Sequence, residues 1–436
     1  MNVRHFTILI IAACSILLSG CRGPKLATAN EQMARGEYFD ASRTYRKVYN
    51  KLTKKEERQL RGEVAFKMAE CHRRLSEYAR ASAAYQNAAR YGYADSTLYL
   101  HMGQCLAAEG KYGPATKAFE DYLQWKPNDR LAQNGLIGAR MGLEKKGQTR
   151  YEVHNAKLFN SRRADYSPMY LDRSLDQLYF TSTNEKVNGQ RKSEVTGMKK
   201  GDIWFVSKDE QGKWKRPEPV EGELNTEVDE GTPAFSPDGS TMYLSRARRE
   251  PNAHTGVEIY TSQRSDAKWS APVKLDITAD TLSSYAHPAV SPDGTWLYFS
   301  SDMPGGQGGK DIWRINLKER KGTLENLGEW INTPGDEVFP SFRSDSVFYF
   351  ASNGHPGYGG LDIFRAEQTK SGGWNVTNMG RPVNSSSDDF GITFGEGESG
   401  FFSSNRADNR GYDHLYSFEL PELKILISGW VLDKDE

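Results

Sequence analysis

The sequence predicts a multidomain protein, in which an all-α helical repeat is followed by an all-β propeller with five blades. Small and apolar residues recur at helical spacing from residue 24 to residue 150, and their pattern repeats after 34 and 40 residues. Between Tyr166 and Tyr416 the pattern changes to strand-like alternation, and one phrase of about 50 residues occurs about five times. The length of 436 residues also exceeds that of one ordinary domain.

Four segments are expected along the chain: a lipoprotein signal peptide over residues 1–20, helical repeats over 21–150, a propeller over 151–420 and the start of a β-sandwich over 421–436. Overall charge is balanced, with 57 basic and 57 acidic residues. Residues 22–150 nevertheless contain 24 Lys and Arg against 14 Asp and Glu, whereas residues 151–436 contain 32 against 43. This asymmetry favours charged partners or mutual docking of the two modules, and two separately solvated surfaces are the alternative.

The N-terminus has the features of a secretory signal. After Arg4 and His5, an apolar run of thirteen residues from Phe6 to Leu18 is too short to span a bilayer. It ends in Leu18-Ser19-Gly20-Cys21, which resembles the bacterial lipobox. The resemblance implies lipid attachment at Cys21, and Arg22 in place of Asp implies sorting to the outer membrane, with the body on the periplasmic side. An ordinary signal peptide with an incidental cysteine is the alternative.

Three anchors define the helical repeat, each with a turn, an alanine and an aromatic residue: Gly36-Glu37-Tyr38 with Ala41 and Tyr45, Ser76-Glu77-Tyr78 with Ala81 and Tyr85, and Gly110-Lys111-Tyr112 with Ala115 and Phe119. This pattern resembles the tetratricopeptide repeat, in which the alanine allows close helix approach and the aromatic ring fills the gap between repeats. The resemblance implies a groove that binds a peptide or a partner protein, with a rigid spacer as the alternative.

Two cysteines outside the signal segment occupy equivalent positions of successive repeats, Cys71 and Cys105. Stacked helices lie roughly 9–10 Å apart, whereas the Cα atoms of a disulfide lie within about 7 Å. We therefore expect two buried free thiols, with a disulfide between them as the alternative. His72 and His101 lie nearby, but their spacing is not that of a metal site.

The propeller phrase has three parts. The inner strand opens at Pro168, Pro233, Pro288, Pro340 and Gly391. An acidic turn and a run rich in aromatic residues follow, as in SPDGTWLYFS over residues 291–300. The third strand begins at an acid before an apolar pair: Asp202, Glu258, Asp311, Asp362 and Asp413. Because an acid occurs there in every copy, it is expected to accept backbone hydrogen bonds and not to act in catalysis. The arrangement resembles the PD40 repeats, which are WD40-like.

The fifth blade is expected to take its outer strand from the N-terminal end of the propeller. Three blades end in a phrase with a central asparagine, at Asn225, Asn332 and Asn384. The same phrase occurs at residues 157–165, before the first inner strand, and nothing equivalent follows the fifth copy. Residues 151–165 should therefore complete the last blade and leave no open edge.

Two glycine-rich segments, residues 302–309 and 354–360, are interpreted as rim loops. Protein contact and binding of Ca²⁺ or a glycan are the alternatives. Residues 425–433 read as the first strand of a carboxypeptidase-regulatory-like β-sandwich, so we expect the chain to be part of a longer protein.

The order of these segments resembles the PorE-type outer-membrane lipoproteins of the type IX secretion system. The resemblance implies a non-enzymatic scaffold that links the secretion machinery to the outer membrane and cell wall. Its partners would be other envelope secretion proteins and, through Cys21, the outer membrane. Peptidoglycan would be bound by an OmpA-like domain that this chain does not contain. No cofactor, metal or nucleic-acid partner is expected.

Two other function classes compete with the scaffold. One is a surface or periplasmic glycan-binding lipoprotein that uses the aromatic residues, although packing within strands explains most of them first. The other is a propeller hydrolase. The sequence contains neither a G-x-S-x-G nucleophile motif nor an H-E-x-x-H zinc motif.

Replacement of Cys21 by serine tests the anchor. The Cys21→Ser variant should be released from membranes, because the acylated thiol is lost. Fractionation of cells labelled with palmitate measures both properties. A variant that still labels and still sediments with the outer membrane would contradict the assignment.

Overall fold

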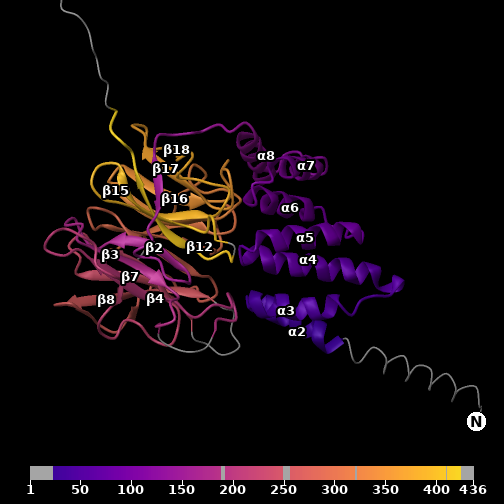
Figure 1. Cartoon of the computed structure of the whole chain (residues 1–436), viewed down its shortest axis with the longest axis horizontal. Helices are drawn as coiled ribbons and strands as arrows, with labels where there is room; N and C mark the ends of the chain where they lie inside the picture. Colours follow the sequence, from indigo (N-terminus) through magenta and orange to yellow (C-terminus); the bar gives the residue numbers. More distant parts are fainter. Residues whose placement is uncertain (1–22, 188–191, 249–255, 320–321, 409, 424–436) are drawn as a thin grey trace, which may run out of the picture.

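The computed structural model describes residues 23–187, 192–248, 256–319, 322–408 and 410–423. Within these ranges, seven α-helices are followed by five antiparallel β-sheets arranged as a propeller (Figure 1). The predicted order of a helical block and a five-bladed propeller is confirmed. Within the described ranges, no helix combines the length and the hydropathy that a membrane span requires.

The helices follow one another as hairpins: α2 (Gly23–Ala34) with α3 (Tyr38–Tyr49), α4 (Arg58–Arg74) with α5 (Tyr78–Arg90), and α6 (Thr97–Ala108) with α7 (Tyr112–Leu123), followed by α8 (Arg130–Leu143). A short 3₁₀ turn, Lys55–Glu57, precedes α4. The hairpin turns contain Gly36, Ser76 and Gly110 at φ of 80°, 53° and 72°. These left-handed conformations end each first helix, as the anchors predict.

The anchor residues form the core of the helical block. The alanine and the aromatic ring of each anchor are at most 1% exposed: Ala41, Tyr45, Ala81, Tyr85, Ala115 and Phe119. A Cβ atom on Gly103 of α6 would lie 2.8 Å from the Phe119 ring, so a glycine at this position of α6 makes room for the ring. Burial of each such aromatic side chain contributes about 1.5–3 kcal/mol.

Cys71 and Cys105 are buried and free, which confirms the expectation for them. Burial, with a smaller contribution from Glu70, raises the pKa of Cys71 to about 12. A thiol with such a pKa is protonated and unreactive at neutral pH. The nearby histidines pair with glutamates: His72 Nδ1 lies 2.5 Å from Glu77 Oε2, and His101 Nδ1 lies 2.6 Å from Glu70 Oε1.

Each blade has four main strands in order from the axis outward. Blade 1 contains β2 (Asp165–Tyr170), β3 (Gln177–Ser182), β4 (Asp202–Ser207) and β5 (Glu218–Pro219). Blade 2 contains β6 (Glu230–Phe235), β7 (Thr241–Ala247), β8 (Val257–Ser265) and β10 (Val273–Lys274), and β9 (Lys268–Trp269) also pairs with β8. Blade 3 contains β11 (Tyr285–Val290), β12 (Trp296–Ser301), β13 (Asp311–Asn316) and β14 (Glu325–Asn326).

Blade 4 contains β15 (Glu337–Ser344), β16 (Val347–Ser352), β17 (Asp362–Gln368) and β18 (Trp374–Asn378). Blade 5 contains β19 (Asp389–Phe394), β20 (Ser399–Ser404), β21 (His414–Glu419) and, as its outer strand, β1 (Glu152–Asn155). The five residues predicted to open the inner strands all lie in innermost strands.

Every inner strand has a shift in register next to a residue with positive φ: Ser167, Thr232, His287, Phe339 and Gly391, at φ between 51° and 61°. Four of these are not glycine, so the backbone is strained there. At three of them, a hydroxyl group of the preceding blade accepts the N–H. The acceptors are Ser403 for Ser167, Thr181 for Thr232 and Ser245 for His287, at 2.7–2.9 Å. These bonds tie neighbouring blades together near the axis.

The recurring asparagine holds the third strand of a blade. Asn332 Oδ1 accepts the N–H of Ile312 at 2.8 Å, and its Nδ2 donates to the carbonyl of the same residue at 3.0 Å. We call this pair of bonds the asparagine bracket. It recurs between Asn225 and Ile203, Asn384 and Ile363, and Asn160 and Leu415.

The ring is closed as predicted, by residues that precede the first blade. β1 pairs antiparallel with β21, from Glu152 opposite Glu419 to Asn155 opposite Tyr416. The strand itself occupies residues 152–155, and the phrase at 157–165 forms the turn that carries Asn160. The strand lies within the predicted segment 151–165 but ahead of the phrase at 157–165, whose residues form the bracket and its turn instead of pairing with the strand edge.

Asn160→Ala tests the closure, with Asn332→Ala as the matched variant inside the ring. Each substitution removes the two bracket bonds and one bond to a second asparagine, and it leaves the N–H of a third-strand residue unpaired. Each should therefore lower the free energy of unfolding by about 2–3 kcal/mol. Chemical denaturation measures both. If Asn332→Ala is destabilised and Asn160→Ala is unchanged, the ring does not depend on its closure.

Candidate interaction site between the helical block and the propeller

The helical block meets the propeller along the edge formed by its three hairpin turns (Figure 1). Tyr78, after the second turn, donates from its hydroxyl to Asp388 Oδ1 at 2.7 Å. Tyr112, after the third turn, accepts from Arg381 Nη2 at 2.6 Å. A Cβ atom on Gly110 would lie 3.5 Å from Ser386. Tyrosine follows the turn in all three anchors, and two of these residues make polar contacts with the propeller.

The first turn contacts a loop of blade 1. The backbone N–H of Phe39 donates to the carbonyl of Val195 at 3.1 Å, and that of Asp40 donates to the carbonyl of Glu194 at 3.4 Å. Helix α3 has no side-chain cap, so the loop accepts N–H groups that the first turn of a helix leaves unpaired. The loop belongs to the longest spacing between inner strands, from Pro168 to Pro233.

The glycine-rich segment 354–360 contacts α8. Asn134 Nδ2 donates to the carbonyl of Gly354 at 2.9 Å, and the Tyr358 hydroxyl donates to the carbonyl of Lys146 at 3.1 Å. Gly138 lies against the backbone of Gly357, where a Cβ atom would overlap the carbonyl oxygen. Of the roles considered for this segment, the structure shows protein contact, made within the chain itself.

In blades 3 and 4 the recurrent acid of the third strand accepts backbone hydrogen bonds from the glycine-rich loops, as predicted, whereas Glu258 of blade 2 pairs with Lys274 Nζ at 2.8 Å. Asp362 Oδ2 accepts the N–H of Gly359 at 2.9 Å, and Asp311 Oδ2 accepts that of Gln307 at 2.5 Å. Burial is the main cause that raises the pKa of Asp362, to about 7. These carboxylates position loops and do not face a free surface.

A cavity of about 230 Å³ lies between the two modules at the mouth of the propeller channel. Arg73 and Arg74 line it from the helical block, and Lys310, Asp336 and Asp388 line it from the propeller. Burial opposes ionisation of Asp336, but the charges of Lys310 and Arg74 outweigh it and hold its pKa below the ordinary value. Arginines of the helical block and acids of the propeller thus line one cavity, where their opposite charges attract.

Aromatic side chains fill the channel below this cavity. The rings of His287 and Phe339 stack with centroids 3.8 Å apart, and Phe339 lies 4.5 Å from Phe390. Burial, and secondarily Lys310, lowers the pKa of His287 well below its usual value, so the stacked imidazole is neutral. Only about 10 Å³ remains between the inner-strand prolines, which is about the space of one water molecule.

The site residue predicted from sequence, Cys21, lies outside the described residues, as does the β-sandwich start at 425–433. The docking residues Tyr78, Arg381 and Asp388 were not predicted as a site. The repeated tyrosine after each helical turn is the sequence signal that could have indicated them.

No family model matches the chain, and no curated protein matches it. Among solved structures, it is similar to TolB from Acinetobacter baumannii, with 17% identity, a TM-score of 0.34, and coverage of 66% of this chain and 69% of that one. A GH43_12 protein from a capybara gut metagenome has 14% identity, a TM-score of 0.40, and coverage of 63% and 54%. The RS223 β-xylosidase has 13% identity, a TM-score of 0.37, and coverage of 61% and 94%. Similarities this distant carry no conclusion about activity.

Gly138→Ala tests the docking, with Gly113→Ala as control. The added methyl group at 138 would overlap the 354–360 loop, whereas nothing lies within 4 Å of a Cβ atom at 113. We expect Gly138→Ala to lose about 1–3 kcal/mol of stability, by overpacking, and to increase hydrogen exchange in α8 and the loop. Gly113→Ala should be neutral or stabilising. Equal exchange in the two variants would contradict the docking.

Proposed function

We propose that this chain is a non-enzymatic scaffold of the bacterial envelope, anchored by lipid at Cys21, that binds other envelope proteins. One observation supports it most: the helical block covers the mouth of the propeller, whose axis is filled by aromatic rings. The two modules are joined by hydrogen bonds from α3, α5, α7 and α8 to blade loops. Such a body presents its outer surfaces to partners in a constant relative orientation.

The edge of the helical block at the turn between α7 and α8 offers an exposed aromatic side chain. Helix α7 starts at the docked Tyr112 and runs for 12 residues, a length of about 18 Å. Trp125 follows its end and is 55% exposed, with its ring 5.4 Å from that of Tyr99. Exposed tryptophans are frequent energetic centres of protein interfaces, so we expect this edge to contact a partner.

The resemblance to PorE-type lipoproteins supports a role in type IX secretion. The partners would then be secretion components of the outer membrane and periplasm, and the lipid on Cys21 would hold the scaffold at the outer membrane. Attachment to peptidoglycan would need a further domain.

Affinity capture from envelope extracts tests this function. The bait is the full chain, compared with Trp125→Ala and with Trp330→Ala, which alters a tryptophan of the propeller that is 63% exposed. Secretion components should be captured by the bait and by Trp330→Ala, and depleted at least about tenfold with Trp125→Ala, because loss of a hot spot costs about 2 kcal/mol or more. Retention of polysaccharide without any secretion component would contradict the proposal.

A groove between blades 1 and 5 favours glycan binding as a second candidate function. It encloses about 370 Å³ and is lined by Tyr170, Trp214 and Phe401. The Lys208 ammonium lies 5.0 Å from the Trp214 ring centroid and offers a hydrogen-bond donor beside the aromatic wall. Retention of the chain on purified envelope polysaccharides, abolished by Trp214→Ala and unaffected by Trp125→Ala, would establish this function in place of protein binding.

A further inference from the structure

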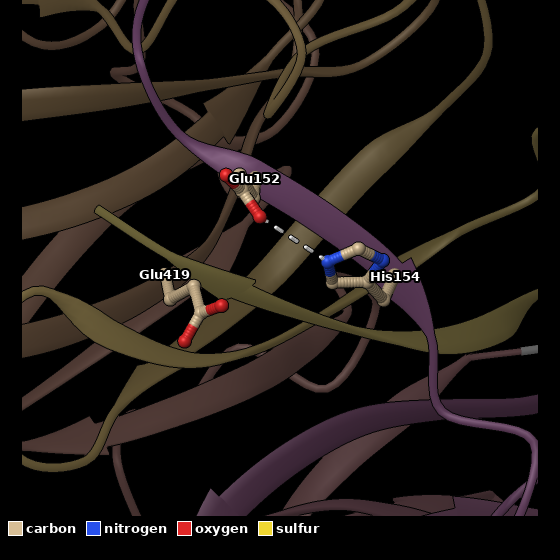
Figure 2. Close-up of side chains that lie close together, drawn as sticks. All are labelled: Glu152, His154 and Glu419. Carbon is tan, nitrogen blue, oxygen red and sulfur yellow. Dashed lines mark ion pairs between the residues drawn. The ribbon is translucent and has the colours of Figure 1, made fainter. Parts of the chain in front are cut away.

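Three potential metal ligands meet where the first and last strands of the propeller pair (Figure 2). Glu152 and His154 lie on one face of β1, and Glu419 lies on β21 directly opposite Glu152. His154 Nε2 is 3.7 Å from Glu152 Oε2. One ligand atom of each residue lies within 4.8 Å of those of the other two.

This pairing places two carboxylates face to face at the joint that closes the ring. Like charges directly opposite on neighbouring antiparallel strands are destabilising. In the registers described for the other four blades, no two acids oppose each other between the third and outer strands. In blade 3 the facing charged residues are of opposite sign: Arg314 lies opposite Glu325, and their Nη2 and Oε2 atoms are 2.6 Å apart. The closing strand pair therefore carries a repulsion that a bound cation would remove.

The ligand set and its support suit a divalent cation. One imidazole and two carboxylates form a mixed nitrogen and oxygen set, which zinc accepts with bonds of about 2.0–2.2 Å. The backbones are held by the ladder pairs on either side, Val153 with Phe418 and Asn155 with Tyr416. The three side chains are exposed, so rotamer changes can bring the ligand atoms to bonding distance without moving the strands.

We propose that Glu152, His154 and Glu419 form a divalent-metal site of the zinc type, which clasps β1 to β21. Three protein ligands leave further coordination positions for water. His154 and Glu419 also line the groove between blades 1 and 5, so these positions open toward it. Because the ligands come from strands at opposite ends of the propeller sequence, the cation would stabilise the closed ring over any state in which β1 has separated.

Titration of the purified full chain with zinc chloride tests the site, by calorimetry and by thermal unfolding in zinc or in chelator. We expect one bound ion per chain and a higher unfolding temperature in zinc. Loss of an outer-shell partner lowers metal affinity roughly 10–100-fold. Because His154→Ala and Glu419→Gln each remove a direct ligand, each should lower the affinity for zinc by more than that. In chelator, Glu419→Gln should be more stable than the unaltered chain, because the facing charges are gone.

Glu325→Gln, at the corresponding outer strand of blade 3, is the matched control and should keep full zinc binding. The proposal is overturned if zinc at 100 times the protein concentration, on the order of millimolar, gives neither heat nor a shift in unfolding temperature. It is also overturned if His154→Ala and Glu419→Gln bind zinc as tightly as Glu325→Gln.

Discussion

The asparagine bracket is the interaction on which the propeller geometry depends. The outer strands β5 and β14 contain only two residues each, so their ladders can satisfy few of the backbone groups of the third strand. Asn332 binds both the N–H and the carbonyl of Ile312, the second residue of β13. Buried backbone groups left unpaired cost about 1–3 kcal/mol each, so the bracket replaces a missing stretch of strand.

Closure and docking follow from the same interaction. Asn160 makes the bracket with Leu415, and thereby assigns the segment just after β1 to the last blade. Since β1 begins nine residues after α8 ends, the C-terminal end of the helical block is held next to blades 4 and 5. Backbone bonds join the linker to this region, from Arg381 N–H to the Gly147 carbonyl at 2.8 Å and from Thr149 N–H to the Arg381 carbonyl at 2.7 Å.

Much of the fold could be predicted because its signals are local and repeated. A glycine or serine at a helical turn and an alanine with an aromatic ring four residues later recur after 40 and 34 residues, and a proline marks four of the five inner strands. The bracket phrase even identified the closure, although β1 itself, Glu152–Asn155, has no distinctive pattern. The docking surface could not be located, since it relies on backbone carbonyls such as that of Val195 and on the close approach of Gly138, which charge and hydropathy do not encode.

Sites formed between distant segments are also invisible in the sequence. Glu152 and Glu419 face each other only because the register of β1 on β21 places them there. A histidine two residues from a glutamate is unremarkable by itself. The tyrosines after the turns at residues 76 and 110 form a visible pattern, but their partners, Asp388 and Arg381, belong to another module.

Native-state hydrogen exchange of two amides tests the central claim. This claim is that the bracket of Asn160 holds the closing blade as firmly as the brackets of Asn225, Asn332 and Asn384 hold blades 1, 3 and 4. The amide of Leu415 donates to Asn160, and that of Ile312 donates to Asn332. Both amides should exchange through the same global opening, with equal free energies of opening. Exchange of Leu415 through a smaller, local opening, while Ile312 stays fully protected, would show that the ring opens at β1 and would contradict the account.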